Sequence, residues 1–128
     1  DNGSIVNPRT LAGQGWGGTA NGSGTALSEQ FNYDADGQFL NPNFAEFAMP
    51  TANEMPRNFK LGHVETPSPY TEYGIKGGGE GGRLGAPSAL TSAIEDALSD
   101  RGVKIAALPV TPPILRGLIR AAEQTAAE

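Results

Sequence analysis

Apolar residues recur at helical spacing near the end of the chain, between Pro87 and Gly102. Proline is common in the first turn of a helix and glycine just past its end, so these two residues mark the expected limits. Intervals of three and four residues place the apolar side chains on one face, and we predict a helix here. The stripe consists of Leu90, Ala93, Ile94, Ala97 and Leu98.

A second amphipathic helix is predicted after Thr111. Thr111 is the expected N-cap and Pro112 the first helical residue, because proline lacks the N–H that the first turn leaves unpaired. The preceding residues 103–110, VKIAALPV, predict a short strand. The apolar stripe of the helix consists of Ile114, Leu115, Leu118, Ile119 and Ala122.

The first half of the chain favours extended structure at three places. Residues 1–8, DNGSIVNP, predict the end of a strand followed by an Asn-Pro turn. Residues 29–40 alternate around an Asp-Gly pair, which predicts a β-hairpin. Residues 58–65, NFKLGHVE, predict another strand, and the proline-punctuated stretch between the last two predicts an irregular connection.

A glycine-rich segment, residues 11–27, is open to two interpretations. Its small residues Gly13, Gly17, Ala20 and Gly24 are spaced so that they lie on one face of a helix. Glycine lowers helix stability by up to about 1 kcal/mol relative to alanine, which instead favours a flexible loop. A buried helix whose small face lets another group approach its backbone would reconcile the two observations. The sequence leaves helix and loop equally open.

The predicted elements are strand, glycine-rich helix, hairpin, strand, glycine loop, helix, strand and helix. This order indicates an α/β (α+β) fold. Only 38% of the residues are hydrophobic, and large side chains are few among them. We therefore expect residues 1–128 to be a piece of a domain that another chain completes, not an independent domain.

Charge and cysteine content exclude several function classes. The net charge is −5 and the nine Lys and Arg residues are scattered, so no basic surface for nucleic acid is expected. There is no cysteine to form a disulfide or bind a metal, and no group of acidic residues has metal-ligand spacing. No segment approaches the roughly 18 apolar residues of a membrane span, and the first residues lack the features of a signal peptide. We expect a protein of the cytoplasm.

The most unusual stretch is residues 74–87, GIKGGGEGGRLGAP, in which glycines surround a single carboxylate, Glu80. Residues 77–82 match the dinucleotide-binding pattern G-x-G-x-x-G. The match is weak, because the acid about twenty residues on, Asp100, follows a predicted helix instead of a strand. Alternatively, the glycines admit a bulky ligand to the carboxylate, which becomes a better base when shielded from water. A solvated surface glutamate is the simplest alternative.

Two polar residues outside this loop, Gln14 and His63, are also candidates for a functional role. Gln14 lies among glycines, where its amide could donate and accept hydrogen bonds to a polar ligand without obstruction. His63, the one histidine, lies within a predicted strand and has no partner motif, which indicates a structural role.

Residues 74–98 resemble the C-terminal signature of the large subunit of molybdenum hydroxylases. This family comprises xanthine dehydrogenases, aldehyde oxidases and aerobic carbon monoxide dehydrogenases. Its signature is a lysine, then G-x-G-E, small residues and a helix start with Gly-Ala/Pro-Pro. Residues 1–40 are similar to the upstream segment of the same family, where an Asp-x-Gly strand and an Asn-Pro pair precede G-Q-x-x-G-G. The motifs ETPSP and LPVTPPILRGLI also fit, so the resemblance covers essentially the whole chain.

The resemblance implies that Glu80, which matches the glutamate of G-x-G-E, is a catalytic base beside molybdenum. It also implies that Gln14, which matches the glutamine of G-Q-x-x-G-G, contacts a molybdopterin cofactor, expected in its cytosine dinucleotide form. Neighbouring glycines would admit the pterin or offer backbone groups near the metal. These are Gly13, Gly17, Gly18, Gly78, Gly79 and Gly81.

The resemblance covers only the last part of the family's large subunit, and it therefore implies partners. These are the remainder of that subunit, and iron–sulfur and flavin subunits that carry 2Fe-2S clusters and FAD. The small-molecule substrate is left open among N-heterocycles, aldehydes, purines and carbon monoxide. Two other functions also stay open: a non-catalytic structural or assembly subunit, and, less favoured, a dinucleotide-binding module.

Overall fold

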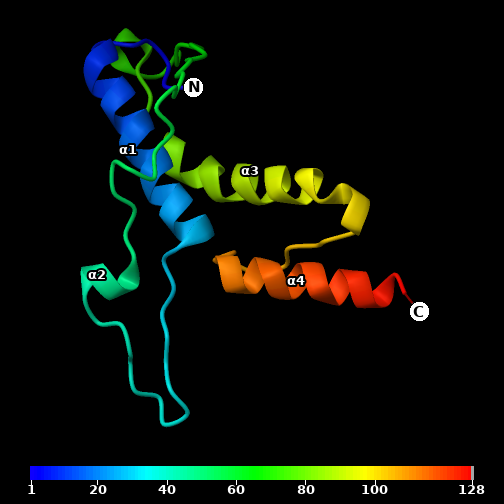
Figure 1. Ribbon diagram of the computed structural model, residues 1–128. Coiled ribbons are helices and arrows are strands. Elements are labelled where there is room, and N and C mark those ends of the chain that lie inside the picture. Colours follow the sequence, from blue (N-terminus) through cyan, green and yellow to red (C-terminus); the bar gives the residue numbers. More distant parts are fainter. Residues whose placement is uncertain (128) are drawn as a thin grey trace.

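The computed structural model describes residues 1–127 as a mainly helical chain of open shape (Figure 1). Two long helices, α1 and α3, cross near the start of α3, and α4 leads to the C-terminus. A largely non-helical arm carries the short α2. In chain order the elements are α1 (Pro8–Leu27), α2 (Phe44–Phe47), the 3-10 turn η1 (Glu72–Gly74), α3 (Gly81–Ala97), the 3-10 turn η2 (Ser99–Arg101) and α4 (Pro112–Thr125).

Helix α1 confirms the helical interpretation of the glycine-rich segment, and the loop interpretation was wrong. Asn7 is the N-cap, and its side-chain oxygen accepts hydrogen bonds from the backbone N–H groups of Arg9 (3.1 Å) and Thr10 (3.2 Å). Pro8 follows as the first helical residue. The N–H of this position has no partner within a helix, so proline, which lacks it, costs no hydrogen bond there. The Asn-Pro pair therefore begins a helix and does not form the predicted turn.

Close contact between α1 and α3 explains how α1 tolerates its glycines. A β-carbon built on Gly22 would lie 2.8 Å from the Arg83 carbonyl oxygen and 2.7 Å from the Ala86 β-carbon. One built on Gly18 would lie 2.9 Å from the Arg83 nitrogen. A side chain at either position would force the helices apart, so the packing at the crossing offsets the low helix propensity of glycine.

The face of α1 that contacts α3 differs from the small face that the spacing predicted. Gly24, which belongs to the predicted face, lies against Glu29 and Pro50 instead. Gly13 and Gly17, from the same face, have no contacting group within 4 Å of an added β-carbon. Several stripes of small residues coexist on so glycine-rich a helix, so spacing alone did not identify the one that packs.

Helix α3 begins earlier than its apolar stripe predicts, directly after Glu80. Pro87 therefore lies inside the helix, where it cannot donate the hydrogen bond that the Arg83 carbonyl would accept. The glycines of the first turn carry no apolar signal, which is why the pattern missed the start. The end agrees with the prediction, because Gly102 adopts a left-handed φ of 65° and closes the turn that follows α3.

The predicted strands do not form within residues 1–127, so the α/β expectation is corrected to a mainly helical fold. Residues 58–65 and 103–110 are non-helical segments outside any ladder. A strand needs a neighbour for its backbone N–H and C=O groups, and an alternating sequence records only a preference for extended backbone. The isolated bridges that do form pair Gly3 with Ile75 and Tyr33 with Phe39.

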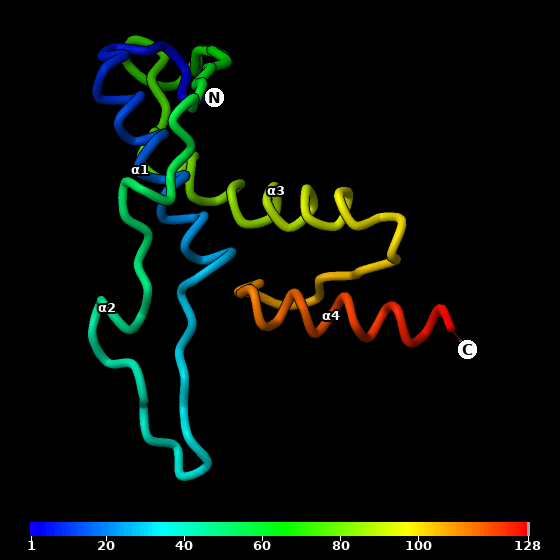
Figure 2. The backbone as a smooth tube through the Cα atoms, in the orientation of Figure 1, coloured from blue at the N-terminus to red at the C-terminus, as the bar shows by residue number. Residues whose placement is uncertain are grey.

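Residues 28–50 form an arm that extends away from the helices (Figure 2). Its tip is the predicted Asp-Gly turn. Gly37, with a φ of 82°, donates its N–H to the Asp34 carbonyl oxygen at 3.1 Å. The Asp34 N–H in turn donates to the Gln38 carbonyl oxygen at 3.1 Å. The reversal of the chain is therefore confirmed, whereas a ladder of paired strands is absent from this arm.

Asn41 joins the two sides of the arm and is 6% exposed. Its amide nitrogen donates to the Gln30 carbonyl oxygen (2.5 Å), and its amide oxygen accepts from the Asn32 N–H (2.9 Å). Phe31 stacks on Phe47 across the arm, with ring centroids 4.9 Å apart. A buried side-chain amide thus adds to the few backbone hydrogen bonds that join the two sides.

The most buried apolar side chains lie where the end of α1 meets the segment that leads into α4. They are Ala26, Val103 and Val110, each at most 3% exposed. The Val110 N–H donates to the Ala26 carbonyl oxygen at 2.6 Å, which ties the two segments together. Among the described residues no large side chain is fully buried, so this part of the chain has only a small core.

Helix α4 confirms the second predicted amphipathic helix. Pro112 is its first residue and Thr111 its N-cap, although the Thr111 side chain makes no capping hydrogen bond. Four residues of its apolar stripe are half-buried: Leu115, Leu118, Ile119 and Ala122.

Candidate cofactor and catalytic site

Glu80 lies at the junction between the glycine loop and α3, as the N-cap residue of that helix. Its backbone carbonyl oxygen accepts hydrogen bonds from the N–H groups of Arg83 (3.0 Å) and Leu84 (3.1 Å). Its carboxylate makes no capping hydrogen bond and is exposed. Formation of the helix therefore holds the backbone of Glu80 but does not use its carboxylate.

The shielding from water that would make Glu80 a better base is not supplied by residues 1–127. A shielded carboxylate was one alternative for this loop and a solvated glutamate the other, and Glu80 is exposed within residues 1–127. An added β-carbon on either neighbour, Gly79 or Gly81, would contact nothing within 4 Å. A ligand or another polypeptide segment can therefore occupy the space beside the carboxylate, and either would displace water from it.

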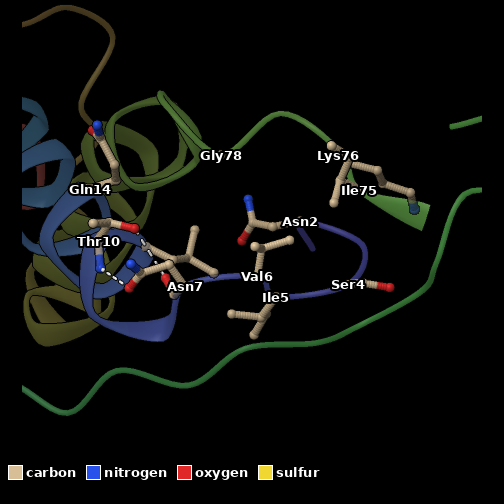
Figure 3. Close-up of a pocket in the computed structure, with 11 residues that line it drawn as sticks. Asn2, Ser4, Ile5, Val6, Asn7, Thr10, Gln14, Ile75, Lys76 and Gly78 are labelled. Atoms are coloured by element: carbon tan, nitrogen blue, oxygen red, sulfur yellow. Dashed lines mark hydrogen bonds between the residues drawn. The ribbon is translucent and has the colours of Figure 1, made fainter. Parts of the chain in front are cut away.

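A pocket of about 350 Å³ opens beside the glycine loop (Figure 3). It brings together Gln14 of α1 and Gly78 of the loop, two residues that the sequence analysis expected to contact a cofactor. Figure 3 shows Gln14 and Thr10 at one end of the pocket, and Ser4 and Lys76 at the other. Its volume falls at the lower end of the range of about 300–1,000 Å³ that is typical of ligand sites.

A second pocket, of about 340 Å³, shares Asn2, Leu11 and Gly78 with the first. Gly81 and Gly82 line it from the start of α3, and His63 lines it from the extended segment 58–65. The sequence pattern indicated a structural role for His63 and did not identify Asn2 as a site residue. No local signal could have found either residue, because both reach the loop through contacts between distant parts of the sequence.

The glycines expected to contact a cofactor fall into two groups. Gly18 is needed at the helix crossing, and a β-carbon on Gly78 would lie 3.0 Å from the Leu11 side chain. The others have no group within 4 Å of an added β-carbon, and none of them has a positive φ. Neither a neighbour within this chain nor the backbone conformation therefore requires glycine there. This second group consists of Gly13, Gly17, Gly79 and Gly81.

The first pocket suits a flat heterocycle with both donors and acceptors. The exposed Gln14 amide offers both kinds of group, and Gly78 exposes backbone at the same pocket. Ile5, Val6 and Leu11 add apolar lining on which the faces of a ring could lie. The residues present therefore fit a pterin-type cofactor.

Residues 1–127 offer neither a cluster of metal ligands nor a membrane-spanning helix. No group of three or more His, Asp and Glu side chains is arranged to hold a metal ion there. None of the helices in that part of the chain is long and apolar enough to cross a membrane.

The sequence has clear relatives. Residues 1–56 match the molybdopterin cofactor-binding domain family. The chain is 42% identical to the nicotine 6-hydroxylase large subunit of Paenarthrobacter nicotinovorans, over 88% of this chain and 14% of that protein. It is 34% identical to the carbon monoxide dehydrogenase large chain of Hydrogenophaga pseudoflava, over 87% of this chain and 14% of that protein.

The fold also has a clear counterpart among solved structures. The crystal structure of quinoline 2-oxidoreductase from Pseudomonas putida 86 superposes with a TM-score of 0.88 at 37% identity, over 94% of this chain. The alignment covers 15% of that chain. This chain therefore spans only a small part of the length of the relatives that it matches.

Proposed function

Because the chain belongs to the molybdenum hydroxylase large-subunit family, we propose that it supplies the catalytic base and part of the cofactor site of such an enzyme. One observation carries the proposal: Glu80 is an unused, exposed carboxylate between Gly79 and Gly81, where nothing within residues 1–127 requires glycine. A proton acceptor with open space on both sides can reach a cofactor and a substrate that bind next to it.

The cofactor we propose is molybdopterin in its cytosine dinucleotide form, with molybdenum. When bound, it would supply the redox chemistry, taking electrons from the substrate while oxygen derived from water is added. Gln14 would hold it through its amide, and Gly78 through backbone groups at the same pocket. The open glycines Gly13 and Gly17 of α1, together with those beside Glu80, would let it approach the backbone closely. Gly18 is proposed as a further contact, besides its place in the helix crossing.

Glu80 would accept the proton that is released as the substrate carbon is hydroxylated. A carboxylate does this well when it is ionised beforehand and lies within hydrogen-bond distance of the reacting group. Cofactor and neighbouring polypeptide would exclude water around it and so make it a better base. Its backbone is held by the first turn of α3, which favours a defined position for the side chain.

For the substrate we propose a small N-heteroaromatic compound, oxidised at an electron-poor ring carbon. The relatives named for nicotine and quinoline, both of which contain a pyridine ring, are 42% and 37% identical to this chain. The relatives named for xanthine and for carbon monoxide are 37% and 34% identical, so the 42% identity to the nicotine relative carries this choice. Assay of the purified enzyme with a pyridine, an aldehyde, a purine and carbon monoxide tests this choice. Preferred oxidation of any of the last three would contradict it.

We propose that the chain works with the remainder of the large subunit and with subunits that carry 2Fe-2S clusters and FAD, in the cytoplasm. The large exposed side chains support a covering partner: Trp16 is 52% exposed, Phe44 80% and Leu84 69%. They are three of many large apolar side chains exposed among residues 1–127, and extensive exposed apolar surface marks interaction sites. Mass spectrometry of the native complex, with metal and flavin analysis, would identify the chains and cofactors that are present.

The variant Glu80→Gln of the assembled enzyme tests the catalytic role. It keeps the size of the side chain and removes the base, so turnover should fall by about 10²- to 10⁴-fold while molybdenum content is retained. Glu72→Gln is the matched control, because Glu72 is an exposed acid that lines neither pocket next to the loop. Normal turnover of molybdenum-loaded Glu80→Gln would refute the assignment.

The two other function classes make different predictions for the same purified complex. A purely structural or assembly subunit would carry no molybdenum and would oxidise none of the substrates. A dinucleotide-binding module would bind NAD without molybdenum. Metal analysis and an NAD-binding measurement therefore separate all three.

A further inference from the structure

The N-terminal segment meets two segments that lie 65 and 75 residues further along the chain, next to the glycine loop, and Asp1 lies at the centre of their contacts. One oxygen of its carboxylate accepts hydrogen bonds from the backbone N–H groups of Gly3 (2.9 Å) and Thr66 (3.1 Å). The other accepts from the Thr66 hydroxyl and from the Lys76 ammonium group, the latter at 2.8 Å. We call Asp1, Thr66 and Lys76 the clamp.

Lys76 lines the first pocket, but its ammonium group is hydrogen-bonded within the clamp. Its ammonium group bonds to Asp1 and also donates to the Thr66 hydroxyl oxygen at 2.8 Å. Figure 3 shows its side chain extending away from Gly78 and Gln14. A lysine four residues before the proposed base therefore serves to anchor the chain.

The backbone on either side of Lys76 is held as well. The Lys76 N–H donates to the Asn2 carbonyl oxygen at 2.9 Å, and the Asn2 amide donates to the Gly77 carbonyl oxygen at 3.0 Å. Gly3 pairs with Ile75, and the Ser4 N–H donates to the Gly74 carbonyl oxygen at 3.2 Å. The strand-like entry to the loop is thus fixed as far as Gly77.

Between Gly77 and Glu80 the loop lacks backbone hydrogen bonds within residues 1–127. Within residues 1–127, Gly78 and Gly79 form no backbone hydrogen bond, and the next one is accepted by the Glu80 carbonyl oxygen from Arg83. Glu80 therefore lies between two fixed points, the clamp on one side and the α1–α3 crossing on the other. Glycine has the greatest backbone freedom of any residue, so the position of Glu80 depends on how firmly both points are held.

We propose that Asp1, Thr66 and Lys76 are positioning residues, which fix the entry to the glycine loop and thereby place the Glu80 carboxylate. This inference rests on the proposed function of Glu80. Proton transfer requires heavy-atom distances of about 2.6–3.2 Å, so a loop that shifts at its anchored end loses rate without losing its cofactor. Lys76 and Asp1 line the two pockets, but their charged groups are bonded to each other, and in this scheme they bind neither substrate nor cofactor.

The variant Thr66→Val of the assembled enzyme is the main test. It keeps the shape of the side chain and removes the hydroxyl that donates to Asp1 and accepts from Lys76. We expect kcat to fall about 10-fold, since misplacement by about 1 Å can cost up to 10²-fold. KM and molybdenum content should stay unchanged. Amide exchange of Ser4 and Lys76, whose N–H groups are hydrogen-bonded across the entry to the loop, should become faster. This measures how firmly the entry is held and does not depend on activity. Thr66→Ser restores the hydroxyl and should restore both kcat and slow exchange.

A double variant shows whether the clamp acts through Glu80. In a Glu80→Gln background, Thr66→Val should cause little further loss, because residues that act as one unit are not additive. An equal 10-fold loss in both backgrounds would overturn the inference, and so would unchanged kcat and exchange in Thr66→Val. If Thr66→Val does not assemble, Asp1→Asn, which removes the charge but keeps the shape, takes its place.

Failure of this inference differs from failure of the proposed function. If Glu80→Gln is inactive while the clamp variants keep full kcat and slow exchange, only the clamp is refuted. If Glu80→Gln itself is fully active, the proposed base is wrong, and the clamp falls with it.

Discussion

The Arg83 carbonyl oxygen of α3 faces Gly22 of α1, 2.8 Å from the position that a β-carbon on that glycine would occupy. It is also the carbonyl that Pro87 leaves without an intrahelical donor, because proline has no N–H. The hydrogen bond that Pro87 removes from α3 and the side chain that Gly22 lacks in α1 therefore lie at the same contact. Since α3 begins directly after Glu80, this crossing is one of the two fixed points that place the proposed base.

Replacement of Gly22 by alanine should weaken the crossing. Alanine favours a helix by up to about 1 kcal/mol, but its β-carbon would lie 2.8 Å from the Arg83 oxygen, and overpacking of this kind costs about 1–3 kcal/mol. We expect lower thermal stability of the assembled enzyme, measured as the midpoint of unfolding. Gly85→Ala is the matched control: it is also helical, but nothing lies within 4 Å of its added β-carbon, so stability should be unchanged or slightly higher. Equal midpoints for both variants would contradict the contact.

Gln14→Ala should reduce retention of the cofactor. Gln14 is exposed at the first pocket, and its amide is the polar group of α1 that we assign to the cofactor. Loss of one or two hydrogen bonds, worth about 0.5–1.5 kcal/mol each, should lower affinity by about 10-fold. The measurement is molybdenum per enzyme after dialysis. Gln38→Ala, at the exposed tip of the arm, should retain the metal fully. Unchanged molybdenum in Gln14→Ala would remove that residue from the site.

Asn41→Ala should loosen the arm. The substitution leaves the Gln30 carbonyl and the Asn32 N–H without their partner in a position that is 6% exposed, which costs about 1–3 kcal/mol. Amide exchange of residues 28–50 in the assembled enzyme should accelerate. Asn58→Ala, an exposed asparagine outside the arm, should leave that exchange unchanged. Protection of the arm as strong as before would show that other contacts hold it.

The turn at Thr51 should respond to acid. The Thr51 hydroxyl (2.6 Å) and backbone N–H (2.5 Å) both donate to the Glu54 carboxylate, and they hold the pKa of that carboxyl below its ordinary value. Because the pKa is lower in the folded state, ionised Glu54 stabilises the turn above its unfolded pKa. This contribution is lost as the pH falls through the folded pKa. Thr51→Val removes the hydroxyl and should raise the pKa of Glu54 toward its ordinary value.

An NMR titration of carboxyl-labelled glutamate in the assembled protein measures that shift. The backbone N–H remains in Thr51→Val, so the pKa should rise only part of the way. An identical titration curve for Glu54 in both proteins would show that the Thr51 hydroxyl does not act on it.

Local chemistry predicted the elements whose signals lie within a few residues. The prediction of helix α4 was correct because a Thr-Pro start and an apolar stripe are adjacent in the sequence. The prediction of the turn at Gly37 was also correct, because the Asp-Gly pair is a local signal and its glycine adopts the positive φ that the turn requires. The strands were wrong because extended segments form ladders only with neighbours, and sequence alternation does not say whether a neighbour exists. The start of α3 was missed because its first turn is stabilised by contact with α1 and not by apolar side chains of its own.

By itself the sequence determined the family, the single carboxylate among glycines and the local caps and turns, because each depends on residues adjacent in the chain. Only the tertiary structure decided which glycines pack α1 against α3, and that Asn2, Gln14 and His63 gather around the loop that carries Glu80. It also decided that Asp1, Thr66 and Lys76 meet behind that loop. These contacts join residues up to 75 positions apart, and such pairs are brought together by the path of the whole chain and not by the preference of any one segment.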